Sequence, residues 1–294
     1  MEMRLTAQSD VGHLVRVAMK HPREAFISQA SIDAQWKDLN FSAAPDFRVA
    51  CRQFDSLVRL LEDNGTQVDL LPADSRTGLD SIYTRDASFV SDRGVIFGRM
   101  GKALRAGEPA VQHEAFLAIG LSILGTIAPP GTVEGGDLAW LDERTLAAGH
   151  GYRTNAEGIR QLGDLLGDAI DTLVVAPLPH WSGVGDVMHL MSLISPVGAR
   201  LAVAYSPLLP VPFRTSLLDR GFALIEVPDE EFENMATNVL TIAPGTVVTL
   251  KGNPRTRAAL EAAGINVLEY DGSEISVKGA GGPTCLTRPL LRSA

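Results

Sequence analysis

Residues 281–290, GGPTCLTRPL, carry one of the two cysteines in the chain, Cys285. Two glycines and a proline precede this cysteine, which argues against an ordinary core strand and favours close approach of the backbone to another group. An ionised thiol is a strong nucleophile, and a neighbouring cation favours ionisation. The alternative is that Cys285 is a small buried residue, as most free cysteines are. The other cysteine, Cys51, lies in a helical pattern and is predicted to be structural.

Further residues that could do chemistry stand at comparable places, where a polar or glycine-rich turn runs into an apolar strand. Histidine exchanges protons near neutral pH, and carboxylates bind cations through charged hydrogen bonds. The turns are DSIYTRDASFV, TVEGGDLAWL, GDVMHLMSLI, NMATNVLTI and GGPTCLTRPL, which carry Asp80 and Asp86, Glu134 and Asp137, His189, Asn238, and Cys285, respectively.

Each of these residues, taken singly, also has an ordinary structural interpretation. His189 could be a hydrogen-bonded core histidine, and Asp86 could pair with a neighbouring arginine. Glu134 could cap the turn formed by the two glycines that follow it. Asn238 is the weakest candidate of the set. A functional interpretation therefore depends on whether the fold brings the turns together.

A repeated pattern in the sequence predicts that the fold brings these turns together. Five segments combine a helical pattern, often with a glycine near its end, and a short apolar strand, namely 57–71, 115–128, 159–176, 217–227 and 260–270. Glycine suits the left-handed residue that ends a helix, and the apolar residues after it are predicted to form buried strands. Self-similarity at this period predicts a repeat or ring architecture. In a ring, the turns that follow the five segments would meet near one axis.

The composition fits a folded protein that binds a small cation. The chain has 294 residues, of which 45% are hydrophobic and 21% charged, and its net charge is -9. A negative surface disfavours nucleic acid and suits a cationic ligand. The sequence contains no CxxC pair, so the cysteines give no sign of a zinc site. Neither a signal peptide nor a membrane-spanning run is recognisable, so we expect a cytoplasmic protein without a membrane partner.

Five motifs together resemble the guanidine-modifying superfamily, which includes dimethylarginine dimethylaminohydrolases, arginine deiminases and amidinotransferases. EGGD alone would be a modest signal, but five motifs in the family's order over nearly the whole chain are specific. The resemblance implies an α/β fold, a five-bladed propeller of pseudo-fivefold ββαβ units, as a single catalytic domain over residues 1–294. The motifs are D-x-x-x-x-R-D (Asp80 to Asp86), EGGD (Glu134 to Asp137), YRTN (Tyr152 to Asn155), HLMS (His189 to Ser192) and GGPTCL (Gly281 to Leu286).

The resemblance also implies roles for the matching residues and requires neither a metal nor an organic cofactor. It further implies that a homodimer can form, although no motif marks an interface. The implied roles are nucleophile for Cys285, acid and base for His189, guanidinium binding for Asp86 and Glu134, a further substrate contact for Asp80, and binding of the substrate α-carboxylate for Arg105 and Arg153.

This set predicts hydrolysis at the guanidino carbon of arginine or an N-methylated arginine, giving citrulline and ammonia or a methylamine. Two carboxylates hold the planar cation, and Cys285 attacks its central carbon. His189 protonates the leaving amine and then activates water against the covalent thiouronium. The alternatives are an amidinotransferase, which passes the amidino group to an amine, and a non-catalytic arginine-binding protein on the same fold.

Some positions depart from individual members of the family, which keeps the exact substrate open. Arg85 and Met191 stand where dimethylarginine hydrolases carry an acidic residue and a lysine, and HLMS lacks the HxD acid of arginine deiminases. Residues 20–31, KHPREAFISQAS, follow the first predicted strand. They are interpreted either as a lid over the pocket or as an ordinary surface loop.

Overall fold

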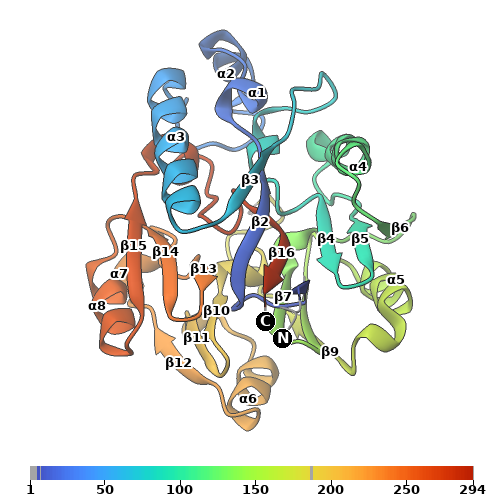
Figure 1. Ribbon diagram of the computed structural model, residues 1–294, viewed down its shortest axis with the longest axis vertical. Coiled ribbons are helices and arrows are strands. Elements are labelled where there is room, and N and C mark those ends of the chain that lie inside the picture. The colour runs from blue at the N-terminus through green and yellow to red at the C-terminus, as the bar shows by residue number, and fades with distance from the viewer. Residues whose placement is uncertain (1–4, 7, 186–187, 294) are drawn as a thin grey trace.

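Five small β-sheets form a ring in the computed structural model, which describes residues 5–6, 8–185 and 188–293 (Figure 1). Four sheets have three strands, in the orders β4-β5-β6, β7-β8-β9, β10-β11-β12 and β13-β14-β15, and the fifth has the order β1-β16-β2-β3. The strands are β1 (Leu5–Thr6), β2 (His13–Met19), β3 (Gln67–Leu70), β4 (Ser88–Ser91), β5 (Gly94–Phe97), β6 (Ile123–Thr126), β7 (Leu138–Asp142), β8 (Thr145–His150), β9 (Thr172–Pro177), β10 (Ile194–Gly198), β11 (Leu201–Ala204), β12 (Ala223–Glu226), β13 (Leu240–Ala243), β14 (Thr246–Leu250), β15 (Asn266–Tyr270) and β16 (Arg288–Ser293).

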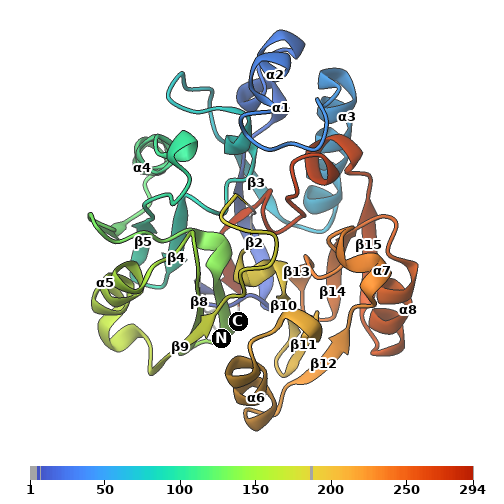
Figure 2. The same ribbon diagram turned by 180° about the vertical axis from the view of Figure 1, so that it is seen from behind.

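Each sheet is built in the same way. An inner strand pairs antiparallel with a middle strand, and the middle strand pairs parallel with an outer strand, as in β7, β8 and β9. The parallel connection needs a crossover, which a helix supplies on the outside of the ring (Figure 2). The helices are α1 (Pro22–Ala25), α2 (Gln29–Gln35), α3 (Phe47–Asp63), α4 (Glu108–Ala118), α5 (Ala156–Leu166), α6 (Val211–Asp219), α7 (Asp229–Phe232) and α8 (Pro254–Ala262).

The ring is closed by strands from both ends of the chain. The inner strand of the first sheet is β16, which pairs antiparallel with β2, and β2 pairs parallel with β3. Both termini consequently lie near the middle of the ring (Figure 1). The predicted five-bladed α/β propeller of ββαβ units is confirmed.

The repeated glycine has a positive φ in every blade. Gly65, Gly120, Gly167, Gly221 and Gly264 have φ values of +84°, +80°, +51°, +81° and +81°. Gly167 differs from the others in that its ψ is -127° and it begins the short helical turn Gly167–Ala169. Residues with a side chain rarely adopt a positive φ. The glycine therefore ends the helix and turns the chain into the outer strand.

The prediction that these outer strands are buried was wrong. Only Ala176 in β9, and Val267 and Tyr270 in β15, are buried; the other residues of these strands are half-buried or exposed, and Val175 is 45% exposed. These strands are sheet edges, so only one of their faces packs against the helices. The inner strands are the buried ones, and all residues of β4 are buried.

Helix α3 shows how the outer helices are anchored. Asp46 caps its first turn by accepting a hydrogen bond from the backbone N–H of Val49 at 2.8 Å. Phe54, Leu57 and Leu61 recur at helical spacing and are fully buried against the first sheet. Cys51 is also buried in this helix, as its predicted structural role requires.

Candidate active site

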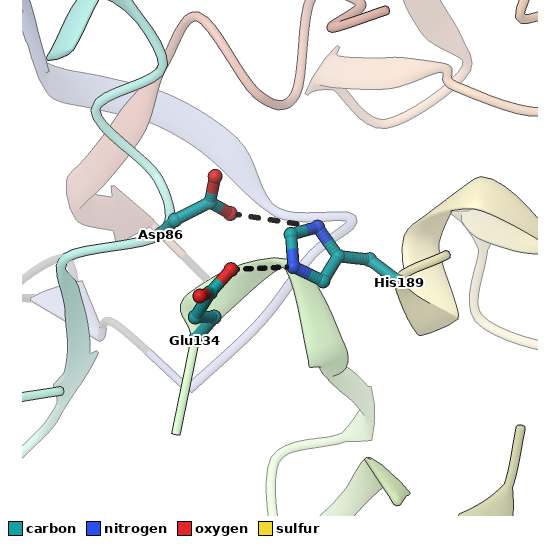
Figure 3. A group of neighbouring side chains, drawn as sticks. All are labelled: Asp86, Glu134 and His189. Carbon is teal, nitrogen blue, oxygen red and sulfur yellow. Dashed lines mark hydrogen bonds and ion pairs between the residues drawn. The ribbon is translucent and has the colours of Figure 1, made fainter. Parts of the chain in front are cut away.

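The turns that enter the inner strands meet at one end of the ring. Asp86 lies before β4, Glu134 lies before the short helical turn Gly135–Asp137 and β7, and His189 lies before the turn Leu190–Ser192 and β10. His189 Nε2 is 2.8 Å from Glu134 Oε2, and His189 Nδ1 is 3.8 Å from Asp86 Oδ1 (Figure 3). Three blades thus contribute one side chain each to a single cluster.

The three side chains are buried and shift one another's protonation. Burial disfavours the imidazolium of His189, but Asp86, Asp137 and Glu134 together raise the pKa of His189 to about 9. Burial also disfavours the carboxylate of Glu134, but His189 and two arginines lower the pKa of Glu134 to about 2. At neutral pH the pair is therefore an imidazolium and a carboxylate, and the histidine carries a proton that it can donate.

The two glycines of the EGGD motif allow this close approach. A Cβ atom on Gly136 would lie 2.5 Å from His189 Nδ1 and 2.7 Å from Asp86 Oδ1. One on Gly135 would lie 2.2 Å from the carbonyl oxygen of Arg85. The Gly136 N–H also donates to Asp86 Oδ1 at 3.1 Å. A side chain at Gly136 would therefore push the Asp86 carboxylate and the His189 imidazole apart, and one at Gly135 would displace the turn from the backbone of Arg85.

Cys285 lies beside this cluster, half-buried, and is held by Asn238, which precedes β13 in the β13-β14-β15 blade. Its Sγ accepts a hydrogen bond from Asn238 Nδ2 at 3.4 Å. Asn238 Oδ1 in turn accepts from the backbone N–H of Thr284 at 3.0 Å and from its hydroxyl at 2.8 Å. A Cβ on Gly282 would lie 2.4 Å from Asn238 Oδ1, which confirms the predicted close approach of this backbone. Asn238, the weakest candidate in the sequence, thus positions the thiol.

The thiol of Cys285 is protonated near neutral pH. Burial raises its pKa above the usual range, and the negative charge of Asp86 raises it further. Hydrogen bonds from Thr284, Asn238 and the Gly282 backbone lower it in part. A cation placed between the thiol and Asp86 would offset both unfavourable effects.

Arg105 is buried and bonded on several sides. Its Nη1 donates to Asp86 Oδ2 at 2.6 Å, and its Nε and Nη2 donate to Glu108 at 2.9 and 2.8 Å. Nη2 also donates to the carbonyl oxygen of Tyr83 at 3.1 Å. These contacts fix the orientation of Asp86, so the geometry ties Arg105 to that carboxylate.

The other two predicted binding residues, Arg153 and Asp80, are each held by an ion pair. Arg153 Nη1 donates to Glu134 Oε2 at 3.3 Å. Asp80 Oδ2 accepts from Lys102 Nζ at 2.7 Å, and the same ammonium donates to the carbonyl oxygen of Leu39 at 2.8 Å. Lys102 was missed by the sequence analysis because it lies in no motif.

Two neighbouring cavities give access to Cys285 and His189. The first, of about 100 Å³, is lined by all the predicted site residues except Glu134, which is fully buried behind His189. The second, of about 180 Å³, shares Cys285 and His189 and is otherwise lined mainly by Trp181, Met188, Phe232, Glu233, Met235 and Asn238.

Neither interpretation of residues 20–31, a lid over the pocket or an ordinary surface loop, matches the structure. That segment forms α1 and the beginning of α2, and it does not line either of these cavities. Leu39 and Asn40, which follow α2, line the first cavity opposite Ala280 and Gly281.

One group in the described part of the chain could in principle hold a metal ion. Ligand atoms of Asp86, Glu134 and His189 lie within 4.8 Å of one another. However, Arg105 and Arg153 already neutralise these two carboxylates, which opposes a divalent cation. We expect incubation with EDTA followed by gel filtration to leave turnover unchanged. Loss of activity that zinc or manganese restores would contradict this expectation.

The ring of ββαβ blades, with a cysteine, a histidine and two carboxylates at one end, defines a guanidine-modifying enzyme fold. The chain belongs to the arginine deiminase family, since the family model described as Arginine deiminase matches residues 80–209 and 205–292. No helix among the described residues has the length and apolar character needed to cross a membrane.

Individual relatives agree with this assignment. The chain is 30% identical over 288 residues to the uncharacterized protein YkgA of Bacillus subtilis, covering 97% of this chain and 94% of that protein. It is 29% identical to the N(G),N(G)-dimethylarginine dimethylaminohydrolase of Pseudomonas aeruginosa, covering 83% and 89%. A solved structure of a cysteine-to-serine mutant of the latter enzyme, complexed with citrulline, superposes with a TM-score of 0.76 at 26% identity, covering 95% of this chain and 99% of that one.

Proposed function

We propose that the protein hydrolyses the guanidino group of arginine or an N-methylated arginine to citrulline, as a single catalytic domain over residues 1–294. The observation that carries the proposal is the convergence of Cys285, His189 and Asp86 on one cavity. Relatives named as dimethylarginine dimethylaminohydrolase and arginine deiminase support it, as does the related structure that contains citrulline.

The guanidinium of the substrate would lie against Asp86, between this carboxylate and Cys285. Arg105 holds the carboxylate in place, so we assign it a positioning role in addition to any contact with substrate. Arg153 and the Lys102–Asp80 pair line the same cavity. They would bind the two charged groups of an amino-acid substrate. The cationic side chains would face its α-carboxylate, and Asp80 would face its α-amino group.

The first chemical step is attack of the Cys285 sulfur on the central guanidino carbon. The cation offsets the two effects that raise the pKa of the thiol, so substrate binding itself favours the thiolate, and the thiol proton is released to solvent. The imidazolium of His189 then protonates the departing amine as the C–N bond breaks. The carbon remains attached to sulfur as a thiouronium.

The second step is hydrolysis of that intermediate. Neutral His189 takes a proton from a water molecule, whose oxygen attacks the same carbon, and the C–S bond breaks to release the ureido product and the thiol. Glu134 would serve by holding His189 Nε2 and stabilising its charged form. Since Glu134 is fully buried, it acts through the histidine more directly than through the substrate.

The pKa of the thiol can be tested without substrate. Because the pKa of Cys285 is raised, the thiolate fraction should grow about tenfold per pH unit below that pKa. We expect the rate of alkylation by iodoacetamide to follow this slope between about pH 6 and 8. The measurement is best made in a Cys51→Ser background, with mass spectrometry locating the modification. A rate independent of pH in this interval would mean that the free enzyme already holds a thiolate.

A citrulline assay with arginine, monomethylarginine and dimethylarginine offered separately tests the function itself. Citrulline from methylated substrates alone would define a dimethylarginine dimethylaminohydrolase activity, and citrulline from arginine a deiminase activity. Ornithine appearing after citrulline would indicate a dihydrolase. The absence of product from all three substrates would refute the proposal.

Amidino transfer is the second candidate, and the second cavity favours it. From that cavity an amine could reach the amidino carbon that is attached to the Cys285 sulfur. Glu233 offers a carboxylate there, and Trp181 and Phe232 offer aromatic faces to a cation. Transfer would require an added amine acceptor and would release ornithine and a new guanidine. Mass spectrometry of the products with and without glycine separates transfer from hydrolysis.

A further inference from the structure

A second cluster of buried charges lies on the axis of the ring, next to the site but outside it. It contains Arg85 from the turn before β4, Arg288 and Arg292 on β16, and Asp10 between β1 and β2. None of the four is more than 7% exposed. Three guanidinium groups thus face one carboxylate, which leaves two positive charges without an acidic partner in the cluster.

Within this cluster only a few of the guanidinium N–H groups donate hydrogen bonds to acceptors of the protein. Asp10 Oδ1 accepts from Arg85 Nη2 at 2.9 Å, and Asp10 Oδ2 accepts from the backbone N–H of Trp140 at 2.7 Å. Arg288 Nη2 donates to the carbonyl oxygen of Arg85 at 2.7 Å. Arg292 Nη1 donates to the carbonyl oxygens of Thr241 at 2.9 Å and Gly12 at 2.5 Å.

The remaining donors have no acceptor among the described residues. They are Nε and Nη1 of Arg85, Nε of Arg288, Nε and Nη2 of Arg292, and the indole N–H of Trp140. Buried polar groups are nearly always hydrogen-bonded, and a buried unpaired charge costs far more than a buried neutral group. So many orphaned donors on one axis indicate a ligand that accepts hydrogen bonds.

Charge distinguishes an anion from water as that ligand. Water could accept the hydrogen bonds, but it would leave the two surplus positive charges in place. Burial, together with Arg85, lowers the pKa of Arg288 well below its usual range, and burial lowers the pKa of Arg292 to about 10. Guanidinium groups nevertheless stay charged in proteins. Asp86, the nearest acid of the active site, is already bound to Arg105.

We propose that the axis of the ring binds a small monovalent inorganic anion, such as chloride, between Arg85, Arg288 and Arg292. The anion would accept hydrogen bonds from the orphaned guanidinium donors and the Trp140 indole, and would reduce the surplus charge from two to one. The inference does not rest on the proposed enzymatic function.

The proposed anion site contacts the turns that carry the catalytic residues. Arg85 is the residue before Asp86, and its backbone N–H donates to the carbonyl oxygen of Cys285 at 3.2 Å. A Cβ on Gly135 of the EGGD turn would lie 2.8 Å from Arg288 Nη2. The bound anion would therefore stabilise the turns that carry the carboxylates and the thiol.

Thermal unfolding of the full chain in sodium chloride or bromide, compared with sodium gluconate at equal ionic strength, tests the proposal. A ligand that binds only the folded state raises Tm with its concentration, here by about 2 °C for each tenfold increase above Kd. Gluconate is too large for a buried site and should leave Tm unchanged. The variant Arg292→Met should lose the halide dependence, whereas Arg59→Met, on the exposed face of α3, should keep it.

A direct measurement covers the case in which Arg292→Met does not fold. Crystals of the unmodified protein grown with sodium bromide should show an anomalous bromine peak between the three guanidinium groups. The absence of that peak, with a Tm that follows ionic strength equally in halide and gluconate, would show that water satisfies these donors and would overturn the proposal.

Discussion

Replacing Cys285 with serine is expected to lower citrulline formation by a factor of at least about 10⁴, because covalent catalysis is lost with the nucleophile. A serine hydroxyl is not ionised near neutral pH, and no neighbouring base in the site is free to activate it, since His189 is already protonated with a pKa of about 9. Substrate binding should be retained, because serine is slightly smaller and Asn238 can still donate to its oxygen. Turnover is measured as citrulline, and binding by isothermal titration with the substrate that gives product.

The matched control is Cys51→Ser, which changes the other cysteine in the same way at a buried position of α3. This variant should keep kcat within about threefold, because it lies outside both cavities that reach the site. Retention of normal turnover by Cys285→Ser would eliminate the thiouronium mechanism. Loss of binding as well as turnover would instead mean that the thiol is needed to hold the substrate.

The repeat in the sequence predicted a ring of similar units, and the resemblance to the guanidine-modifying superfamily supplied its five-bladed ββαβ form. A glycine at or near the end of a helix, before a short apolar strand, occurs in each blade, and each such glycine has a positive φ. The burial of the outer strands was predicted wrongly for a physical reason. A run such as Asn266–Tyr270 is equally apolar whether it is a central strand or an edge covered on one face, and local pattern cannot distinguish the two.

The sequence was sufficient to predict which turns form the site, but not the hydrogen bonds and ion pairs that hold its side chains in place. Asp86, Glu134, His189 and Cys285 each mark a strand entrance, so the ring brings them together. Some of the contacts that hold the acidic side chains in place come from residues outside the five motifs. Arg105 bonds to Asp86, and Lys102 bonds to Asp80, from a segment whose sequence gives no hint of these partners. The lid was misplaced because a proline and small polar residues also suit short helices such as α1.

Changing Glu134 to glutamine is expected to lower kcat by about 10²- to 10³-fold, within the range of general acid–base catalysis. The amide keeps the size of the side chain and an oxygen that can accept from the Gly101 N–H, which now donates to Glu134 Oε1 at 2.8 Å. It removes the negative charge that lies 2.8 Å from His189 Nε2 and helps to raise the pKa of the histidine to about 9. The proton on His189 is therefore held less strongly.

The pH dependence of activity reports the lower pKa of His189 in Glu134→Gln separately from any loss of stability. A histidine that must be protonated to release the amine gives a falling limb of activity as pH rises through its pKa, and a lower pKa moves that limb to lower pH. We expect the limb to lie near pH 9 in the unmodified protein and to move toward the ordinary histidine range of about 6.5 in Glu134→Gln. The control is Glu231→Gln, the same change at a buried carboxylate that accepts from the backbone N–H groups of Arg255 and Thr256 at the start of α8 and lines neither cavity. It should leave both kcat and the limb unchanged.

The double variant Glu134→Gln/His189→Asn then decides whether the two residues act as one unit. If Glu134 works through the histidine, its removal should cost almost nothing once His189 is gone, so the two effects on kcat should be strongly non-additive. Fully additive losses would mean that Glu134 contacts the substrate independently, as its place in the EGGD motif first implied. Each result assigns the buried carboxylate to one of the two roles, because a group that acts only through His189 cannot contribute in its absence.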